Sequence, residues 1–183
     1  EIANQFADSA NIILAKDNSE NILENIEGVH GILGCPRHLF TPEVLERNGG
    51  ALKWVHAGGA GVEQFIIKEL VESKIIFTNG RIIQGPECAD HALALLLALT
   101  RNIYRIARDD KDPLPRPIEL MGKIAVVTGV GGIGLLIAER LAAFGTKVIG
   151  VDSDYVPMMS LFHDLLRTDQ LHTILPSADF VIT

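Results

Sequence analysis

The sequence has little cysteine, few aromatic side chains and no long hydrophobic run. Its 183 residues contain two cysteines, and aromatic residues make up 5% of the chain. Cys35 and Cys88 are too few for a disulfide framework, and neither has neighbours at metal-ligand spacing. The longest apolar run, Ala92–Leu99, is much shorter than the roughly 20 residues that a membrane span needs. The acidic start at Glu1 also lacks the basic and apolar regions of a signal peptide. These features predict a cytoplasmic protein with free thiols, no metal site and no membrane anchor.

An excess of positive charge is also missing. The chain has 16 basic and 23 acidic residues, which gives a net charge of −7 and a pI near 5.3. A sequence-independent attraction to nucleic acid or to anionic lipid is therefore not expected. With 48% hydrophobic and 21% charged residues, the composition is that of an ordinary soluble globular protein.

Short apolar runs alternate with helical patterns along the whole chain, which is typical of an α/β protein with parallel sheets. We expect strands at Asn11–Ala15, His30–Gly34, Leu52–His56, Lys74–Thr78, Lys123–Thr128, Lys147–Val151 and Asp179–Ile182. A helix is expected after Thr41 and Pro42, which are typical of a helix start, and Gly49 is expected to end it. Further helices are expected at about 132–144 and 158–167.

The chain divides near a charged, proline-rich stretch. Residues 108–117 hold three of the eight prolines and show no periodicity, which indicates a linker. Residues 86–105 before it form a long helix that is apolar nearly all round, as expected at a domain junction. The sequence therefore predicts a first domain over 1–107, which includes that helix, and a second over 118–183.

A glycine-rich turn is the strongest chemical motif. Gly129, Gly131 and Gly134 fit the pattern G-x-G-x-x-G, follow a β-branched strand directly and open a helix. The next strand ends in Asp152, 18 residues beyond Gly134. Strand, turn, helix, strand and acid are thus in the order of a dinucleotide-binding unit.

Each residue of this motif has an expected role in binding NAD. Gly129 permits a tight turn, Gly131 lets a pyrophosphate approach the backbone, and Gly134 lets the helix pack closely on the strand. With Gly132 and Ile133, they begin a helix whose N–H groups bind the anion. Asp152 accepts hydrogen bonds from the adenosine ribose and would repel the 2′-phosphate of NADP. The alternative is that the glycines only make a tight turn and that Asp152 caps the next element.

Blocks along most of the chain resemble one family in order and spacing. They are residues 52–63, 77–80, 85–102, 121–152 and 175–181. The family is that of the D-isomer-specific 2-hydroxyacid dehydrogenases, which includes lactate, glycerate, glyoxylate and phosphoglycerate dehydrogenases and the related C-terminal-binding corepressors. Glu63 and Asp90 stand where the family usually has Asp and Glu.

The resemblance implies a flavodoxin-like substrate domain followed by the first half of a Rossmann NAD-binding domain. It implies that the N–H groups of Ala60 and Gly61 bind the carboxylate of a small 2-oxo or 2-hydroxy acid, which fits a loop of small residues after a strand. It also implies a homodimer formed largely through the cofactor domain. The family's catalytic arginine, glutamate and histidine would lie beyond Thr183, so no catalytic residue is assigned here, and His91 is interpreted as a helix-packing residue.

Three functions remain open at this point. The first is an NAD-dependent oxidoreductase that interconverts a D-2-hydroxy acid and a 2-oxo acid by hydride transfer. The second is a non-catalytic NAD(H)-binding module, as in the corepressor branch. The third is an NAD-binding piece without activity, because the 183 residues could be part of a longer enzyme or a naturally shortened protein.

Overall fold

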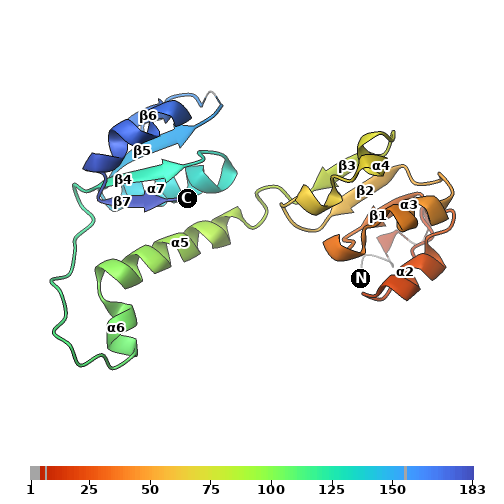
Figure 1. Cartoon of the computed structure of the whole chain (residues 1–183), viewed down its shortest axis with the longest axis horizontal. Helices are drawn as coiled ribbons and strands as arrows, with labels where there is room; N and C mark the ends of the chain where they lie inside the picture. The colour runs from red at the N-terminus through yellow and green to blue at the C-terminus, as the bar shows by residue number, and fades with distance from the viewer. Residues whose placement is uncertain (1–4, 7, 155) are drawn as a thin grey trace. The chain divides into compact units, whose positions relative to one another are not determined.

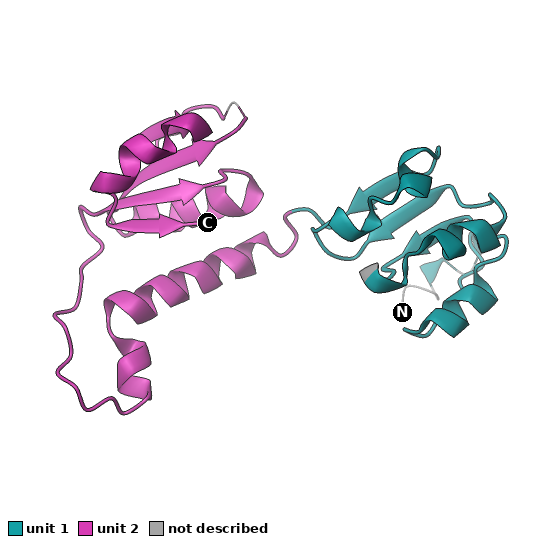
Figure 2. Ribbon diagram, viewed as in Figure 1, with its two compact units in different colours: residues 1–81 teal, residues 82–183 magenta. Residues whose placement is uncertain are grey.

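The computed structural model describes residues 5–6, 8–154 and 156–183. The chain forms two compact units, Glu1–Arg81 and Ile82–Thr183 (Figure 2). Each unit has its own parallel sheet and its own hydrophobic core, so each is described by itself. The α/β class predicted from the sequence is confirmed.

The first unit is built on three parallel strands in the order β1-β2-β3 (Figure 1). The strands are β1 (Gly31–Leu33), β2 (Trp54–Ala57) and β3 (Ile76–Asn79). The helices are α2 (Ser19–Asn25), α3 (Pro42–Asn48) and α4 (Lys68–Val71), with 3-10 turns η1 (Arg37–Leu39) and η2 (Glu63–Phe65). Val55 and Ala57 point into a core with Phe40 and Phe65, because alternate residues of a strand face one side of the sheet.

The start and end of α3 lie where the sequence predicts. Thr41 occupies the N-cap position, without a side-chain hydrogen bond, and Pro42 is the first helical residue. Gly49 ends the helix in the left-handed conformation, with φ of 71°. Asn48, the last helical residue, is buried, and its amide donates to the carbonyls of Ile26 and Val29 at 2.9 and 2.8 Å.

The expected strand at Asn11–Ala15 is wrong. This segment has no assigned strand and no ladder partner, and the three-stranded sheet ends at β1. Leu14 is 83% exposed. An apolar run becomes a strand only when a neighbouring strand satisfies its backbone groups, and here none does so.

The second unit carries four parallel strands in the order β6-β5-β4-β7. The strands are β4 (Ile124–Thr128), β5 (Lys147–Asp152), β6 (Asp164–Arg167) and β7 (Phe180–Ile182). The helices are α5 (Gly85–Thr100), α6 (Ile103–Ala107), α7 (Gly132–Ala143) and α8 (Leu171–Ile174), with 3-10 turns η3 (Thr168–Gln170) and η4 (Leu175–Ser177). Strand order reverses at β4, since β5 and β6 lie on one side of it and β7 on the other. In open α/β sheets, ligands bind beyond the carboxyl ends of the strands at such a reversal.

The helix expected at 158–167 is also wrong. Residues 164–167 form β6, which pairs with β5 from Ile149↔Asp164 to Asp152↔Arg167, and residues 158–163 are not helical. The run from Met158 to Phe162 has good helix formers, but Phe162 and Leu165 are instead packed in the core of this unit. Pairing with β5 therefore overrides the local preference for a helix.

The long apolar helix is shorter than the expected 86–105 and belongs, by its contacts, to the second unit. Helix α5 packs on α7 and ends at Thr100. Asn102 then takes the left-handed conformation, with φ of 57°, before α6 begins. The compact units therefore divide before this helix rather than after it, which differs from the domain boundaries predicted from the sequence.

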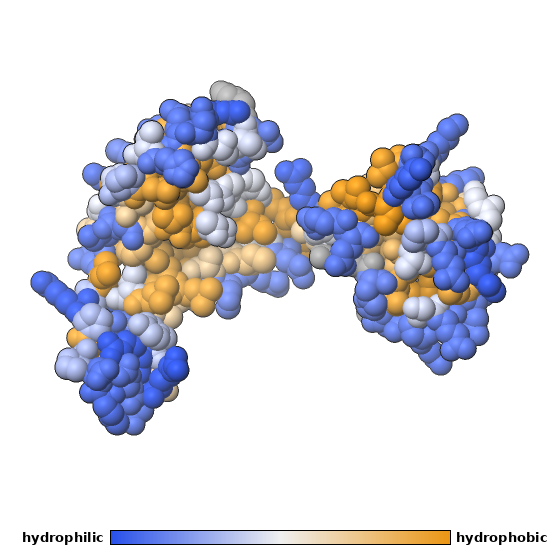
Figure 3. All heavy atoms as spheres, viewed as in Figure 1, coloured by the Kyte–Doolittle hydropathy of each residue, from blue (hydrophilic) through white to orange (hydrophobic). Residues whose placement is uncertain are grey.

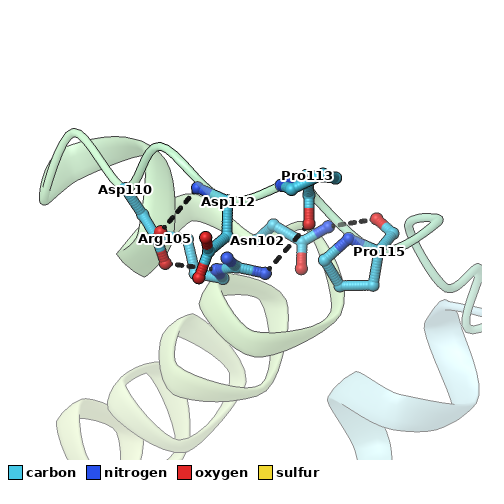
Figure 4. A network of polar contacts seen from close by, with 6 residues as sticks. All are labelled: Asn102, Arg105, Asp110, Asp112, Pro113 and Pro115. Atoms are coloured by element: carbon cyan, nitrogen blue, oxygen red, sulfur yellow. Dashed lines mark hydrogen bonds and ion pairs between the residues drawn. The ribbon is translucent and has the colours of Figure 1, made fainter.

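The linker at 108–117 has no helix or strand, yet it is held against α6 (Figure 4). The buried Asn102 donates its side-chain amide to the carbonyl of Pro115 at 2.8 Å. Arg105 donates its Nε to Asp110 at 2.6 Å and its Nη1 to the carbonyl of Pro113 at 3.4 Å. The proline-rich segment is therefore anchored at several points of its course.

Candidate functional site

Two positions in the loop between β4 and α7 require glycine. Gly129 has φ of 82°, a region that residues with a side chain rarely adopt, and its N–H donates to the carbonyl of Val151 at 2.8 Å. A Cβ atom at Gly134 would lie 1.9 Å from the carbonyl oxygen of Gly129. The first and third glycines of the motif are thus explained by backbone geometry alone.

Gly131 differs, because nothing in the chain lies where its side chain would be. It is the N-cap of α7, and a Cβ atom there would meet no heavy atom within 4 Å. The N–H groups of Gly132, Ile133 and Gly134 donate no hydrogen bond to any described residue, as expected in the first turn of a helix. An open space before free N–H groups at a helix N-terminus suits a phosphate group.

Asp152 lies at the carboxyl end of β5 and is joined directly to this loop. Its Oδ1 accepts the N–H of Asp154 at 2.9 Å, and its Oδ2 accepts the N–H of Val130 at 2.7 Å. These two hydrogen bonds lower the pKa of the Asp152 carboxyl below its ordinary value. The hydrogen bond from Asp154 makes the larger contribution. The carboxylate is therefore ionised at neutral pH, and each oxygen keeps a lone pair for a further donor such as a ribose hydroxyl.

Gly132 lies against the side chain of Ile82, which is 52% exposed. A Cβ atom there would lie 2.6 Å from the side chain of Ile82. Ile133, the next residue, is partly exposed. The structure therefore brings together five of the six residues predicted for cofactor binding around one loop and places Asp152 against that loop.

The residues predicted to bind a substrate carboxylate lie in the first unit, in the loop that follows β2. Ala60 is exposed and Gly61 is half-buried. The carbonyl of Ala60 accepts the side-chain amide of Asn79 at 2.6 Å, and the carbonyl of Gly59 accepts the N–H of Gly80 at 3.0 Å. No role was predicted for Asn79, whose signals in the sequence were its place at the end of the neighbouring strand and in the block 77–80.

A second polar group lies on the same sheet. The indole Nε1 of Trp54 donates to the Thr78 hydroxyl at 2.9 Å, and His56 Nδ1 lies 2.9 Å from the same oxygen. Because an indole N–H only donates, the Thr78 oxygen accepts from it and can give its own hydrogen to His56. These hydrogen bonds join β2 to β3 at side chains that are not buried, since Trp54 is 41% exposed.

Neither a metal centre nor a membrane span is found in the described part of the chain. No three His, Cys, Asp or Glu side chains there are grouped so that they could hold a metal ion. No helix there is both long and apolar enough to cross a bilayer. The two cysteines are free, with Cys35 buried and Cys88 exposed on α5.

Comparison of the sequence with known proteins points to the same kind of domain as the geometry of the glycine loop. Residues 93–183 match the family model described as D-isomer specific 2-hydroxyacid dehydrogenase, NAD binding domain. The chain is 29% identical over 168 residues to a D-3-phosphoglycerate dehydrogenase of Methanocaldococcus jannaschii, covering 88% of this chain and 32% of that protein. It is 34% identical over 137 residues to the corresponding protein of Mycobacterium leprae, covering 71% and 25%. The chain thus spans about a third or less of the length of these relatives.

A solved structure shares the fold. A D-isomer specific 2-hydroxyacid dehydrogenase family protein from Aeromonas salmonicida superposes with a TM-score of 0.78 at 24% identity, over 98% of this chain and 59% of that one. The sequence resemblance, the family model and the strand–glycine loop–helix geometry agree. The chain therefore belongs to the D-isomer specific 2-hydroxyacid dehydrogenase family, and its residues 93–183 correspond to that family's NAD-binding domain.

Proposed function

We propose that this chain is part of an NAD-dependent oxidoreductase that interconverts a D-2-hydroxy acid and a 2-oxo acid by hydride transfer. The observation that carries the proposal is the open space at Gly131, in front of the free N–H groups of α7 and beside the ionised Asp152. Relatives named D-3-phosphoglycerate dehydrogenase, hydroxypyruvate reductase and glyoxylate reductase support a small acid as substrate.

The second unit would hold the cofactor by its pyrophosphate and by its adenosine ribose. The N–H groups of Gly132, Ile133 and Gly134 bind the pyrophosphate, and Gly131 leaves room for it. Asp152 accepts hydrogen bonds from the adenosine ribose, and its negative charge disfavours a 2′-phosphate, so NAD is preferred over NADP. When bound, the nicotinamide ring gives or takes the hydride.

The first unit would bind the acid. The N–H groups of Ala60 and Gly61 hold the substrate carboxylate, as the family resemblance implies. The acid–base histidine, its glutamate and the substrate-binding arginine belong, by the same resemblance, to sequence beyond Thr183. The 183 residues alone are therefore expected to bind NADH without oxidising it.

A fluorescence titration with NADH and NADPH tests the cofactor assignment. We expect NADH to bind more tightly than NADPH, and Asp152→Asn to reduce that difference. The matched control is Asp112→Asn, which changes an exposed carboxylate in the segment 108–117. Equal or tighter binding of NADPH by the unchanged protein would contradict the proposal.

Turnover separates the dehydrogenase from a non-catalytic NAD(H)-binding module of the corepressor kind. The assay is NADH oxidation in the presence of glyoxylate, hydroxypyruvate or pyruvate, with a polypeptide that includes the family's arginine, glutamate and histidine. Oxidation of NADH that requires one of these acids supports the enzyme. Tight NADH binding without turnover on any of them favours the binding module.

We also propose a cytoplasmic homodimer. Hydrophobic residues reach the surface of the second unit (Figure 3), among them Leu99 of α5 at 63% exposed and Met121 at 69%. A second copy could cover these residues. Light scattering checks this, since a dimer has twice the 19.9 kDa of one chain.

A further inference from the structure

The loop after β2 is held by the end of the neighbouring strand through two hydrogen bonds. The side-chain amide of Asn79 donates to the carbonyl of Ala60 at 2.6 Å. The backbone N–H of Gly80 donates to the carbonyl of Gly59 at 3.0 Å. Two successive peptide groups of the loop are thus fixed by the last residue of β3 and the residue directly after it.

Fixing a carbonyl also fixes the N–H of the same peptide group. In a trans peptide the C=O of one residue and the N–H of the next point in opposite directions, and no cis peptide bond is present in the described chain. The carbonyl of Gly59 therefore sets the direction of the Ala60 N–H, and the carbonyl of Ala60 sets that of the Gly61 N–H. Because both carbonyls face the end of β3, both N–H groups face away from it.

These two N–H groups are free to bind an anion. Neither of them donates a hydrogen bond to any residue in the described part of the chain. Ala60 is exposed and Gly61 is half-buried, so a ligand can reach the loop. The hydrogen bond from Asn79 also occupies the Ala60 carbonyl oxygen, whose partial negative charge would otherwise be free to turn toward a carboxylate.

We propose that Asn79 is a positioning residue for the substrate carboxylate. Its side-chain amide holds the Ala60 carbonyl, and this holds the Gly61 N–H toward the bound acid. Asn79 itself is set by the sheet, because it pairs with Ala57 in the register of β2 and β3. The inference rests on the proposed role of Ala60 and Gly61 and adds the residue that orients them.

The test is an oxalate titration followed in the ¹H–¹⁵N NMR spectrum of the whole chain. Oxalate serves as the probe because it presents a carboxylate beside a second oxygen-bearing carbon, as a 2-oxo acid does. In the unchanged protein, the amide signals of Ala60 and Gly61 should shift on titration. Asn79→Ala should weaken oxalate binding about tenfold, because one charge-assisted hydrogen bond is loosened. Asn79→Asp, which cannot donate to the carbonyl and adds negative charge, should weaken it further.

The matched control is Asn25→Ala. Asn25 also donates its side-chain amide to a carbonyl, that of Asn21 at 2.7 Å, but within α2. This variant should bind oxalate as the unchanged protein does. Asn79→Ala should also keep its NADH affinity, because the proposed cofactor residues lie in the other unit.

The outcomes separate the two proposals. If the Ala60 and Gly61 signals of the unchanged protein do not shift, the carboxylate site itself is wrong. If they shift and Asn79→Ala binds oxalate as tightly as before, the site stands and the positioning role is overturned. An equal loss in Asn25→Ala would show a general loss of structure and would also overturn it.

Discussion

Alanine at Gly134 should mainly lower stability, whereas alanine at Gly131 should mainly lower NADH affinity. At Gly134 the new Cβ would lie 1.9 Å from the carbonyl oxygen of Gly129 and 2.9 Å from its carbonyl carbon. At Gly131 it would meet no heavy atom within 4 Å. The first substitution therefore disturbs the folded chain, whereas the second fills a space that we assign to the pyrophosphate.

The expected size of each effect follows from these contacts. Overpacking costs about 1–3 kcal/mol, and Gly134→Ala should reach the upper end because a backbone carbonyl cannot rotate away. For a unit of this size, about 3 kcal/mol lowers the Tm by at least about 10 °C. Gly131→Ala should cost under about 1 kcal/mol, since alanine is only a somewhat poorer N-cap than glycine. Its NADH affinity should fall at least about tenfold, the equivalent of 1.4 kcal/mol.

Thermal unfolding and NADH fluorescence titration measure both quantities on the same samples. Gly58→Ala is the control, because its Cβ would meet only the Cα of Gly34 at an ordinary 3.7 Å. Wild-type NADH affinity in Gly131→Ala would refute the path assigned to the pyrophosphate. An unchanged Tm in Gly134→Ala would refute the close contact between helix and loop.

Three further predictions concern single side chains. Two backbone hydrogen bonds lower the pKa of Asp152 in the folded chain. The stability that it contributes is therefore complete above its unfolded pKa of about 4 and is lost as the pH falls through the lower folded value. Between pH 6 and pH 3, the Tm of Asp152→Asn should fall less than the Tm of the unchanged protein. Parallel curves of Tm against pH would contradict this. Burial, with a smaller contribution from a nearby carboxylate, raises the pKa of Cys35 to about 11. At pH 8 a thiol reagent should therefore modify Cys88 quickly and Cys35 only after unfolding. Rapid modification of both thiols in the folded protein would contradict the burial of Cys35. Arg105→Ala should speed trypsin cleavage within residues 108–117, because it removes contacts that hold this segment, and an unchanged rate would count against that anchoring role.

The geometry of the glycine loop between β4 and α7 could be predicted from sequence because its determinants are local. The glycines of the motif and Asp152 lie within one strand–helix–strand unit. The left-handed conformation at position 129 and the lack of room for a Cβ atom at position 134 both favour glycine, which is visible in the sequence. The ends of α3 were also predictable, since capping depends on a few adjacent residues.

The errors arose where distant parts of the chain decide the structure. The run from Met158 to Arg167 has helical preferences, but its residues 164–167 pair with β5 and form a strand. Residues 11–15 have the composition of a strand but no neighbour to pair with. Asn79 could not be assigned a role because its partner, Ala60, lies 19 residues earlier and is reached only through the pairing of β2 with β3.

The position of the single tryptophan has a practical consequence. Trp54 lies on β2, and its indole is hydrogen-bonded to Thr78 on β3, so its emission reports on the sheet of the first unit. Bound NADH has its own fluorescence, which would report on the second unit. Unfolding of the first unit and release of NADH can therefore be followed in one sample without labels, provided that NADH is excited directly at wavelengths that tryptophan does not absorb.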